Sequence, residues 1–140
     1  MISVVCITNK NDVRIIKNIF NNYKRQIYQN KELIIIVNSN KSIDEYYKIA
    51  DDMNIQNYNI YLLKPEITLG QCLNYSIYKM NGTFWAKMDD DDYYGEKYLT
   101  EAYFCLNKTK ADIVGKKSVR VYDEDTKTLY DINQSKNKFV

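Results

Sequence analysis

The sequence contains no histidine. This absence excludes Ser-His and Cys-His nucleophilic catalysis, histidine general bases and most zinc sites. Cysteine is scarce: Cys6, Cys72 and Cys105 are odd in number, lie far apart and form no CxxC pair. We therefore expect the reduced thiols of a cytosolic protein rather than a disulfide framework. Any chemistry has to use carboxylates, lysine, tyrosine and a hard metal ion.

Long apolar segments and a strong net charge are absent as well. No apolar run approaches the ~20 residues of a membrane span, and residues 1–5 lack the features of a signal peptide. The net charge is only +2, so no strong attraction to nucleic acid or anionic lipid is expected. No RNA-recognition pattern accompanies the aromatic residues. With 140 residues, 45% of them hydrophobic, the chain can form one domain with a sizeable core.

Short apolar runs alternate with segments of helical periodicity. The expected strands are 2–8, 33–37, 59–63, 83–88, 113–114, 118–122 and 128–130, with a hairpin turn at 123–127. Four helices are expected. The first follows a cap at Asn11 or Asp12, and the second runs from a Ser42–Glu45 capping box to about Met53. The third and fourth cover residues 69–80 and 95–107. The tail from Asp131 is polar, and we expect little order there. This alternation predicts an α/β fold with a mostly parallel sheet flanked by helices and a C-terminal hairpin.

Four consecutive aspartates, Asp89 to Asp92, follow the expected buried strand 83–88. Adjacent like charges cost free energy unless a cation compensates them. Two other expected strands end in polar residues, at Thr8-Asn9 and Asn38-Ser39-Asn40, and the carboxyl ends of parallel strands lie at one edge of a sheet. Carboxylate oxygens suit Mg²⁺ or Mn²⁺, which usually also bind phosphate oxygens. The pattern indicates a site for a divalent metal and a nucleotide diphosphate, and on composition alone the alternative is a solvated acidic loop.

Three segments resemble family 2 glycosyltransferases of the GT-A fold, of the kind that builds bacterial surface polysaccharides and teichoic acids. They are ISVVCITN at 2–9, GQCLN at 70–74 and GTFWAKMDDDDYYG at 82–95. The last is similar to the family segment G-x-[YF]-[IW]-x-x-[ML]-D-x-D-D, which contains a DxD motif. The resemblance extends over nearly the whole chain and is most specific in its final third. It implies that residues 1–140 form a single GT-A (Rossmann-like) domain that binds a nucleotide-diphosphate sugar.

The resemblance also implies roles for three polar residues outside the aspartate run. Thr8 would line the nucleotide pocket at the end of the first strand. Asn38 stands where the family often has an aspartate that holds the base. Asn74, on the helix before the fourth strand, would face the nucleotide or brace the aspartate loop.

Within the aspartate run, the resemblance makes Asp89 and Asp91 the DxD pair. Asp91 and Asp92 would hold the metal and the diphosphate. Asp89 would lie nearer the donor sugar or brace the loop, and Asp90 occupies the variable position of the motif. The cofactor implied is Mn²⁺ or Mg²⁺.

The reaction implied by the resemblance is transfer of a sugar, with inversion, from a nucleotide-diphosphate donor to a hydroxyl. A UDP-sugar is the expected donor and a glycan or lipid-linked molecule the expected acceptor. In this family the general base lies well downstream of the aspartates, and full-length members are usually longer than this chain. We therefore expect the donor-binding half, with the acceptor half missing, and nominate no catalytic base. We expect a cytoplasmic location and leave open both self-association and attachment to the inner face of the membrane.

Other α/β readings fit the sequence less well. A receiver domain needs paired acidic residues after the first strand, where Thr8-Asn9 stands. The G-x-G-x-x-G of a dinucleotide-binding oxidoreductase and the spaced acidic loop of a Ca²⁺-binding module are both absent. The alternative that stays open is a non-catalytic nucleotide-sugar-binding or assembly domain, in which an exposed sheet edge would favour self-association.

Overall fold

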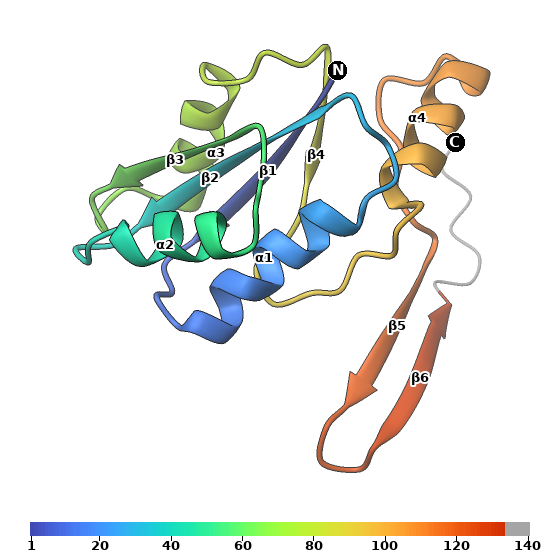
Figure 1. The fold of residues 1–140 in the computed structure, drawn as a ribbon. Coiled ribbons are helices and arrows are strands. Elements are labelled where there is room, and N and C mark those ends of the chain that lie inside the picture. Colours follow the sequence, from blue (N-terminus) through green and yellow to red (C-terminus); the bar gives the residue numbers. More distant parts are fainter. Residues whose placement is uncertain (134–140) are drawn as a thin grey trace. The chain divides into compact units, whose positions relative to one another are not determined.

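Four parallel strands lie at the centre of the fold, in the order β3-β2-β1-β4 (Figure 1). They are β1 (Ile2–Thr8), β2 (Lys31–Asn38), β3 (Tyr58–Leu63) and β4 (Phe84–Lys87). The connecting helices are α1 (Val13–Arg25), α2 (Asp44–Asp52) and α3 (Leu69–Ile77). This computed structural model describes residues 1–133. The α/β class and the parallel sheet expected from the sequence are confirmed.

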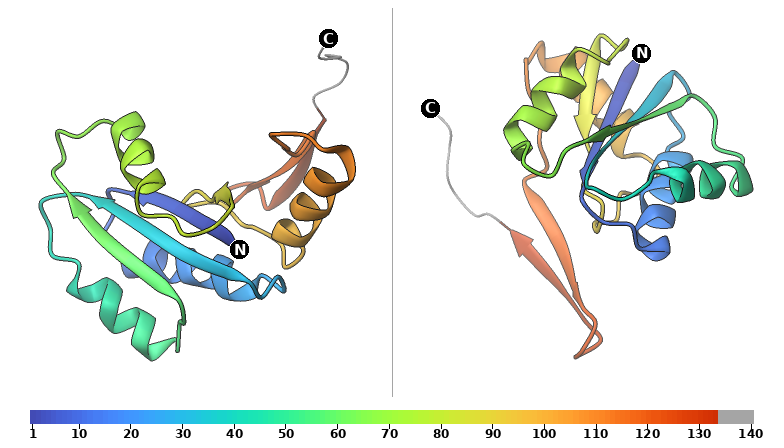
Figure 2. Two further views of the ribbon diagram at one scale, coloured as in Figure 1. Left: turned by 90° about the horizontal axis from the view of Figure 1, so that it is seen from above. Right: turned by 90° about the vertical axis from the view of Figure 1, so that its left-hand side faces the viewer.

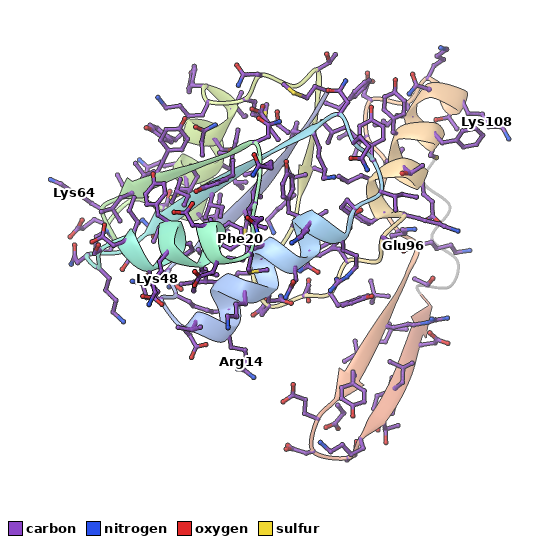
Figure 3. The ribbon with its side chains drawn as sticks, viewed as in Figure 1. Arg14, Phe20, Lys48, Lys64, Glu96 and Lys108 are labelled. Carbon is purple, nitrogen blue, oxygen red and sulfur yellow. The ribbon has the colours of Figure 1, made fainter. Side chains whose placement is uncertain are left out.

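Helices cover both faces of this sheet, with α1 and α2 on one side and α3 on the other (Figure 2). Against α3, Cys72 packs on Val5, Ile34 and Ile36. On the opposite side Phe20 of α1, labelled in Figure 3, is fully buried. The central strand β2 is buried on both faces, which explains its unbroken apolar run. β4 is one of the two edge strands of this sheet and its Trp85 is half exposed, so the expectation of a buried strand at 83–88 was wrong for this side chain.

The chain divides into two compact units, of which the first is Met1–Glu101 and the second begins at Ala102. Helix α4 (Tyr98–Thr109) crosses this division. The second unit contains an antiparallel hairpin of β5 (Ser118–Asp123) and β6 (Thr128–Asn133). Arg120 and Asp131 form an ion pair across the two strands at 2.9 Å. The hairpin and its turn were expected, whereas residues 113–114 form no strand.

The starts of α1 and α3 follow the sequence, whereas those of α2 and α4 depart from it. Asp12 caps α1, because its carboxylate accepts the backbone N–H groups of Arg14 and Ile15. The expected Ser42–Glu45 capping box is wrong: Ile43 is the N-cap of α2, and the Ser42 hydroxyl donates to Asp44 Oδ2 instead.

A true capping box opens α3, where Thr68 accepts the N–H of Gln71 and the Gln71 side chain accepts the N–H of Thr68. A glutamine can close such a box as well as a glutamate, so this T-x-x-Q signal was available in the sequence.

Two helix ends and one strand end also differ from the expectations. Helix α3 ends at Ile77 rather than Met80, and α4 begins at Tyr98 rather than Gly95. Strand β6 continues to Asn133, so the start of the polar tail at Asp131 is part of the hairpin. Residues 134–140 of that tail lie outside the described residues. Within residues 1–133, the helices are too short or too polar to cross a bilayer.

Candidate functional site: the sheet edge between β1 and β4

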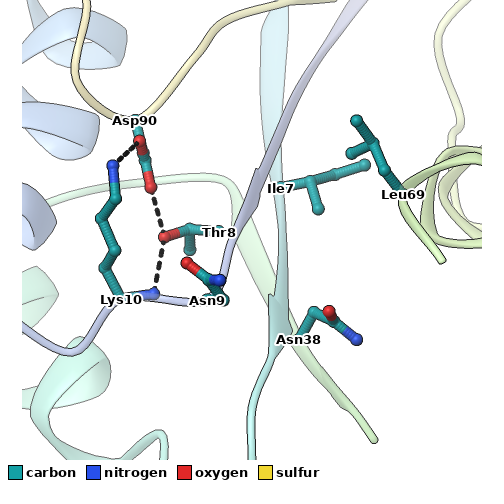
Figure 4. Close-up of a pocket in the computed structure, with 7 residues that line it drawn as sticks. All are labelled: Ile7, Thr8, Asn9, Lys10, Asn38, Leu69 and Asp90. Carbon is teal, nitrogen blue, oxygen red and sulfur yellow. Dashed lines mark hydrogen bonds and ion pairs between the residues drawn. The ribbon is translucent and has the colours of Figure 1, made fainter. Parts of the chain in front are cut away.

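The order in which strands are added to the sheet reverses beside β1. The chain moves outward from β1 to β2 and β3, and then returns to place β4 on the opposite side of β1. At such a switch point the loops after the two strands diverge and leave a crevice, which is where open α/β sheets bind ligands. A cavity of about 260 Å³ opens here (Figure 4). It is lined by Ile7, Thr8, Asn9, Lys10, Asn38, Leu69 and Asp90.

Asp90 joins the two loops that border the crevice. Its side chain is buried, and Oδ2 accepts a 2.6 Å hydrogen bond from Thr8 Oγ1. The same Thr8 hydroxyl oxygen accepts the backbone N–H of Lys10 at 3.1 Å. The resemblance left Asp90 as the variable position, yet it is the most buried of the four aspartates. Its carboxylate therefore fixes the acidic loop against the end of β1.

Lys10 places its ammonium between two carboxylates. Lys10 Nζ lies 2.8 Å from Asp90 Oδ1 and 3.0 Å from Asp91 Oδ2. Hydrogen bonds to Asp90 and Asp91 raise the pKa of Lys10, and the hydrogen bond from Lys10 lowers the pKa of Asp91. Both the Lys10 and the Asp91 side chains are substantially exposed, so solvent screens this attraction.

The other two aspartates have different surroundings. The Asp89 carboxylate pairs with Lys87, and the Asp89 N–H donates to the Tyr94 hydroxyl at 2.9 Å. Burial is the main cause that raises the pKa of Tyr94, so the phenol stays protonated. Asp92 has an exposed side chain, while its carbonyl is held from α1. Asp89 thus contacts Lys87 and Tyr94, whereas the Asp92 carboxylate is exposed to solvent.

Two amides on α1 and a third at its C-cap hold the backbone of the loop Asp89–Asp92 and of the segment that follows it. We call Asn18, Asn22 and Gln26, which are spaced four residues apart, the amide row. Asn18 Nδ2 donates to the carbonyls of residues 90 and 92, and Asn22 Nδ2 donates to the carbonyl of residue 92 at 2.8 Å.

The amide row also fixes the segment that follows the aspartates. Asn22 Oδ1 accepts the N–H of Tyr94, and Gln26 donates to the Gly95 carbonyl and accepts the N–H of Leu99. Arg25 donates to the Tyr94 carbonyl and lies 4.2 Å from the centre of the Tyr93 ring. Because these hydrogen bonds hold the loop backbone against α1, the four carboxylates are already positioned before a ligand binds.

The two asparagines named from the sequence lie in different surroundings. Asn38 lines the cavity, and its Nδ2 donates to the Lys64 carbonyl at 2.6 Å, which braces the turn after β3. Asn74 is exposed on α3 and is not one of the cavity-lining residues. Of the residues named from the sequence, the cavity therefore unites Thr8 and Asn38, with Asp91 attached to it through Lys10.

The donor chemistry of the loop suits Mg²⁺ or Mn²⁺, since Asp91 and Asp92 offer exposed carboxylate oxygens. Among residues 1–133, no three acidic, cysteine or histidine side chains are grouped closely enough to hold a metal unaided. Mg²⁺ in proteins usually binds one or two carboxylates and completes its ligand set with phosphate oxygens and water. The carboxylates of Asp91 and Asp92 are therefore suitable ligands for a divalent ion. Phosphate oxygens and water would have to supply the remaining ligands.

Sequence reasoning missed Lys10 and Asp90 as partners, and missed the amide row. Lys10 follows Thr8-Asn9 directly, so a cation at the end of β1 was visible in the sequence. The amide row was visible as three amides at i, i+4 and i+8 beside the apolar face of α1. Their targets are backbone carbonyls about seventy residues later, which no local pattern indicates.

A protein-family model described as glycosyl transferase family 2 matches residues 4–139. The chain belongs to this family. The match includes most of β1, all of β4 and the four aspartates. Family membership makes the chain a glycosyltransferase domain and confirms the resemblance drawn from its motifs.

Solved structures share the GT-A fold with this family 2 domain. S. aureus TarS is 21% identical with a TM-score of 0.65, and the match covers 79% of this chain and 20% of TarS. TarS 1–349 in complex with UDP-GlcNAc is 20% identical with a TM-score of 0.66, covering 80% of this chain and 33% of that one. The mannosyltransferase PcManGT from Pyrobaculum calidifontis, in complex with GDP-Man and Mn²⁺, is 15% identical with a TM-score of 0.65, covering 74% and 32%.

The chain thus spans a fifth to a third of the length of these three structures. At such low identity the likeness establishes the fold and nothing finer. No curated protein sequence matches the chain.

Proposed function

We propose that this family 2 domain binds a nucleotide-diphosphate sugar in the crevice between β1 and β4, for inverting transfer of the sugar to a hydroxyl acceptor during cell-surface polysaccharide synthesis. The observation that carries the proposal is the convergence of Thr8, Asn38 and the acidic loop on one cavity at the switch point of the sheet. The family match and neighbours solved with UDP-GlcNAc and GDP-Man support a nucleotide-sugar ligand.

In this proposal each donor contact belongs to a residue named from the sequence. Thr8 and Asn38 are the nucleotide-facing groups, and Asp89 and Asp91 are the groups for the donor sugar and diphosphate. Asp91 and Asp92 would hold Mn²⁺ or Mg²⁺, which neutralises charge on a leaving diphosphate when it is bound. The amide row keeps the loop in place while these contacts form, and such preorganisation lowers the cost of binding. Asn74, which is not among the cavity-lining residues, would face the nucleotide or brace the loop.

Residues 1–140 are proposed to be a single donor-binding part of a longer enzyme. The three solved neighbours are three to five times longer than the matched region, which supports this proposal. The second candidate function is a non-catalytic nucleotide-sugar-binding or assembly domain. The exposed apolar side chains of the hairpin, such as Val119 and Leu129, favour a surface that packs on something else.

Calorimetric titration with UDP, GDP and CDP tests the donor site. We expect Mn²⁺-dependent binding of one nucleotide, abolished by EDTA and by the double variant Asp91→Ala/Asp92→Ala. The matched control is Asp123→Ala/Asp125→Ala, which removes two carboxylates from the hairpin turn and should leave binding unchanged. Equal loss in both double variants, or binding insensitive to Asp91 and Asp92, would refute the site. Release of UDP from a UDP-sugar with an acceptor then separates the enzyme from the binding module.

A further inference from the structure

Two lysine side chains form ion pairs with the acidic loop Asp89–Asp92. Lys87 pairs with Asp89, and Lys10 contacts both Asp90 and Asp91. Three of the four carboxylates therefore already face an ammonium group. Among these contacts only those of Lys10 reach a carboxylate proposed as a metal ligand, because Lys10 Nζ lies 3.0 Å from Asp91 Oδ2.

From this geometry we infer that Lys10 is the resident cation of the site and competes with the divalent metal for Asp91. The inference rests on the proposed function, whose metal ligands are Asp91 and Asp92, and deepens it by naming the residue that controls metal entry. It adds a positioning residue that acts on the metal through Asp91.

Three observations support competition rather than shared occupancy. Lys10 occupies one carboxylate oxygen on each of two aspartates, so it stands between them as a bridging cation would. A divalent ion bound to Asp91 at the same time would face that ammonium at a few ångströms, and the two positive charges would repel each other. The backbone at this point is held by the Thr8 hydroxyl on the Lys10 N–H, so movement has to come from the lysine side chain.

The Lys10 side chain can make this movement. It is 40% exposed and runs along the side of the pocket toward Asp90 (Figure 4), so its ammonium can leave Asp91 for water or for an anionic ligand. A donor diphosphate would offer Lys10 such an anion and would offer the metal its missing oxygen ligands. Metal and nucleotide are therefore expected to bind with positive coupling, and weak metal binding is expected without nucleotide.

Mn²⁺ titration followed by electron paramagnetic resonance of the free ion tests this inference directly, without nucleotide and without turnover. Removing the competing charge in Lys10→Met should tighten Mn²⁺ binding by up to about fivefold. Lys10→Arg keeps the charge and should bind Mn²⁺ as the wild type does. Lys48→Met, an exposed lysine on α2, is the matched control and should also leave Mn²⁺ affinity unchanged.

A second titration with UDP present measures the coupling. UDP should raise the Mn²⁺ affinity of the wild type more than that of Lys10→Met, because the variant has no ammonium to displace. Lys10→Gln provides a second neutral variant, and circular dichroism confirms that each variant is folded.

Equal or weaker Mn²⁺ binding by both neutral variants would overturn the inference, as would an absence of Mn²⁺ binding by every protein. Failure of the proposed function is a separate result: no nucleotide binds, whatever the Mn²⁺ titrations of wild type and Lys10→Met give.

Discussion

Gly82 illustrates how closely the chain packs at the end of the sheet opposite the crevice. A Cβ at this position would lie 2.6 Å from Ser3 Oγ and 2.9 Å from the Met1 carbonyl oxygen. We predict that Gly82→Ala lowers the free energy of unfolding by about 1–3 kcal/mol, since backbone atoms must shift to admit a methyl group. Gly70, where a Cβ would meet nothing within 4 Å, provides the control. Urea denaturation should show no loss for Gly70→Ala, and equal losses in the two variants would contradict this account.

Glu32 is a buried carboxylate beside Gly82. It accepts hydrogen bonds from Ser3 Oγ at 2.5 Å and from the Asn81 backbone N–H at 2.6 Å. Burial by itself would raise the pKa of Glu32, but these hydrogen bonds outweigh it and hold the pKa below the ordinary value of 4.5.

The lowered pKa of Glu32 predicts a loss of stability in acid. The folded protein gains stability from ionised Glu32 above the unfolded-state pKa near 4.5, and this gain disappears as the pH falls through the lower folded-state pKa. Glu32→Gln should therefore be less stable than the wild type at pH 7, with a smaller further loss below pH 4.5. Urea titrations at several pH values measure both, with exposed Glu66→Gln as control. If Glu32→Gln lost as much stability below pH 4.5 as the wild type, groups other than Glu32 would be responsible for that loss.

At the scale of elements, the amide row links α1 to the acidic loop. Asn22 is 1% exposed, and its amide bonds both the carbonyl of residue 92 and the N–H of Tyr94. Asn22→Ala removes the acceptor of the Tyr94 N–H and leaves the carbonyl of residue 92 with Asn18 alone, which we predict costs about 1–3 kcal/mol of stability. It should also speed amide hydrogen exchange in residues 89–95. Exposed Asn21 on the same helix is the matched control. Exchange that stays slow in Asn22→Ala would mean that the loop is held from elsewhere.

The element scale also shows how far sequence patterns can lead. The strands and the carboxyl-edge position of the aspartates follow from apolar periodicity, which is local information. The Ser42–Glu45 box failed because Ser42 bonds Asp44 and the helix starts one residue later than the pattern required. The partners of Asp90 could not be predicted, because Thr8 and Lys10 are about eighty residues away in the sequence. Such contacts depend on the order of strands, which places β4 beside β1.

At the scale of the whole chain, burial separates the three cysteines. Cys6 and Cys72 are buried and Cys105 is exposed. Burial, with the nearby charges of Asp90 and Asp89, raises the pKa of the Cys6 thiol, and only the thiolate is reactive. We predict that iodoacetamide modifies one thiol rapidly in the native protein and three in urea, as counted by mass spectrometry. Cys105→Ser should abolish the rapid reaction, and persistent rapid labelling of Cys6 would contradict the packing of β1.

The central claim is that metal and nucleotide bind at the loop Asp89–Asp92, and this chain contains a second acidic segment with which to test it. This segment is Asp123, the last residue of β5, with Glu124 and Asp125 of the hairpin turn, where the N–H groups of Asp125 and Thr126 donate to the Asp123 carboxylate. Mn²⁺ with UDP should therefore broaden the backbone amide resonances of residues 8–10 and 89–92 and leave those of 123–125 sharp. Broadening centred on the hairpin turn, or none within residues 1–101, would contradict the account.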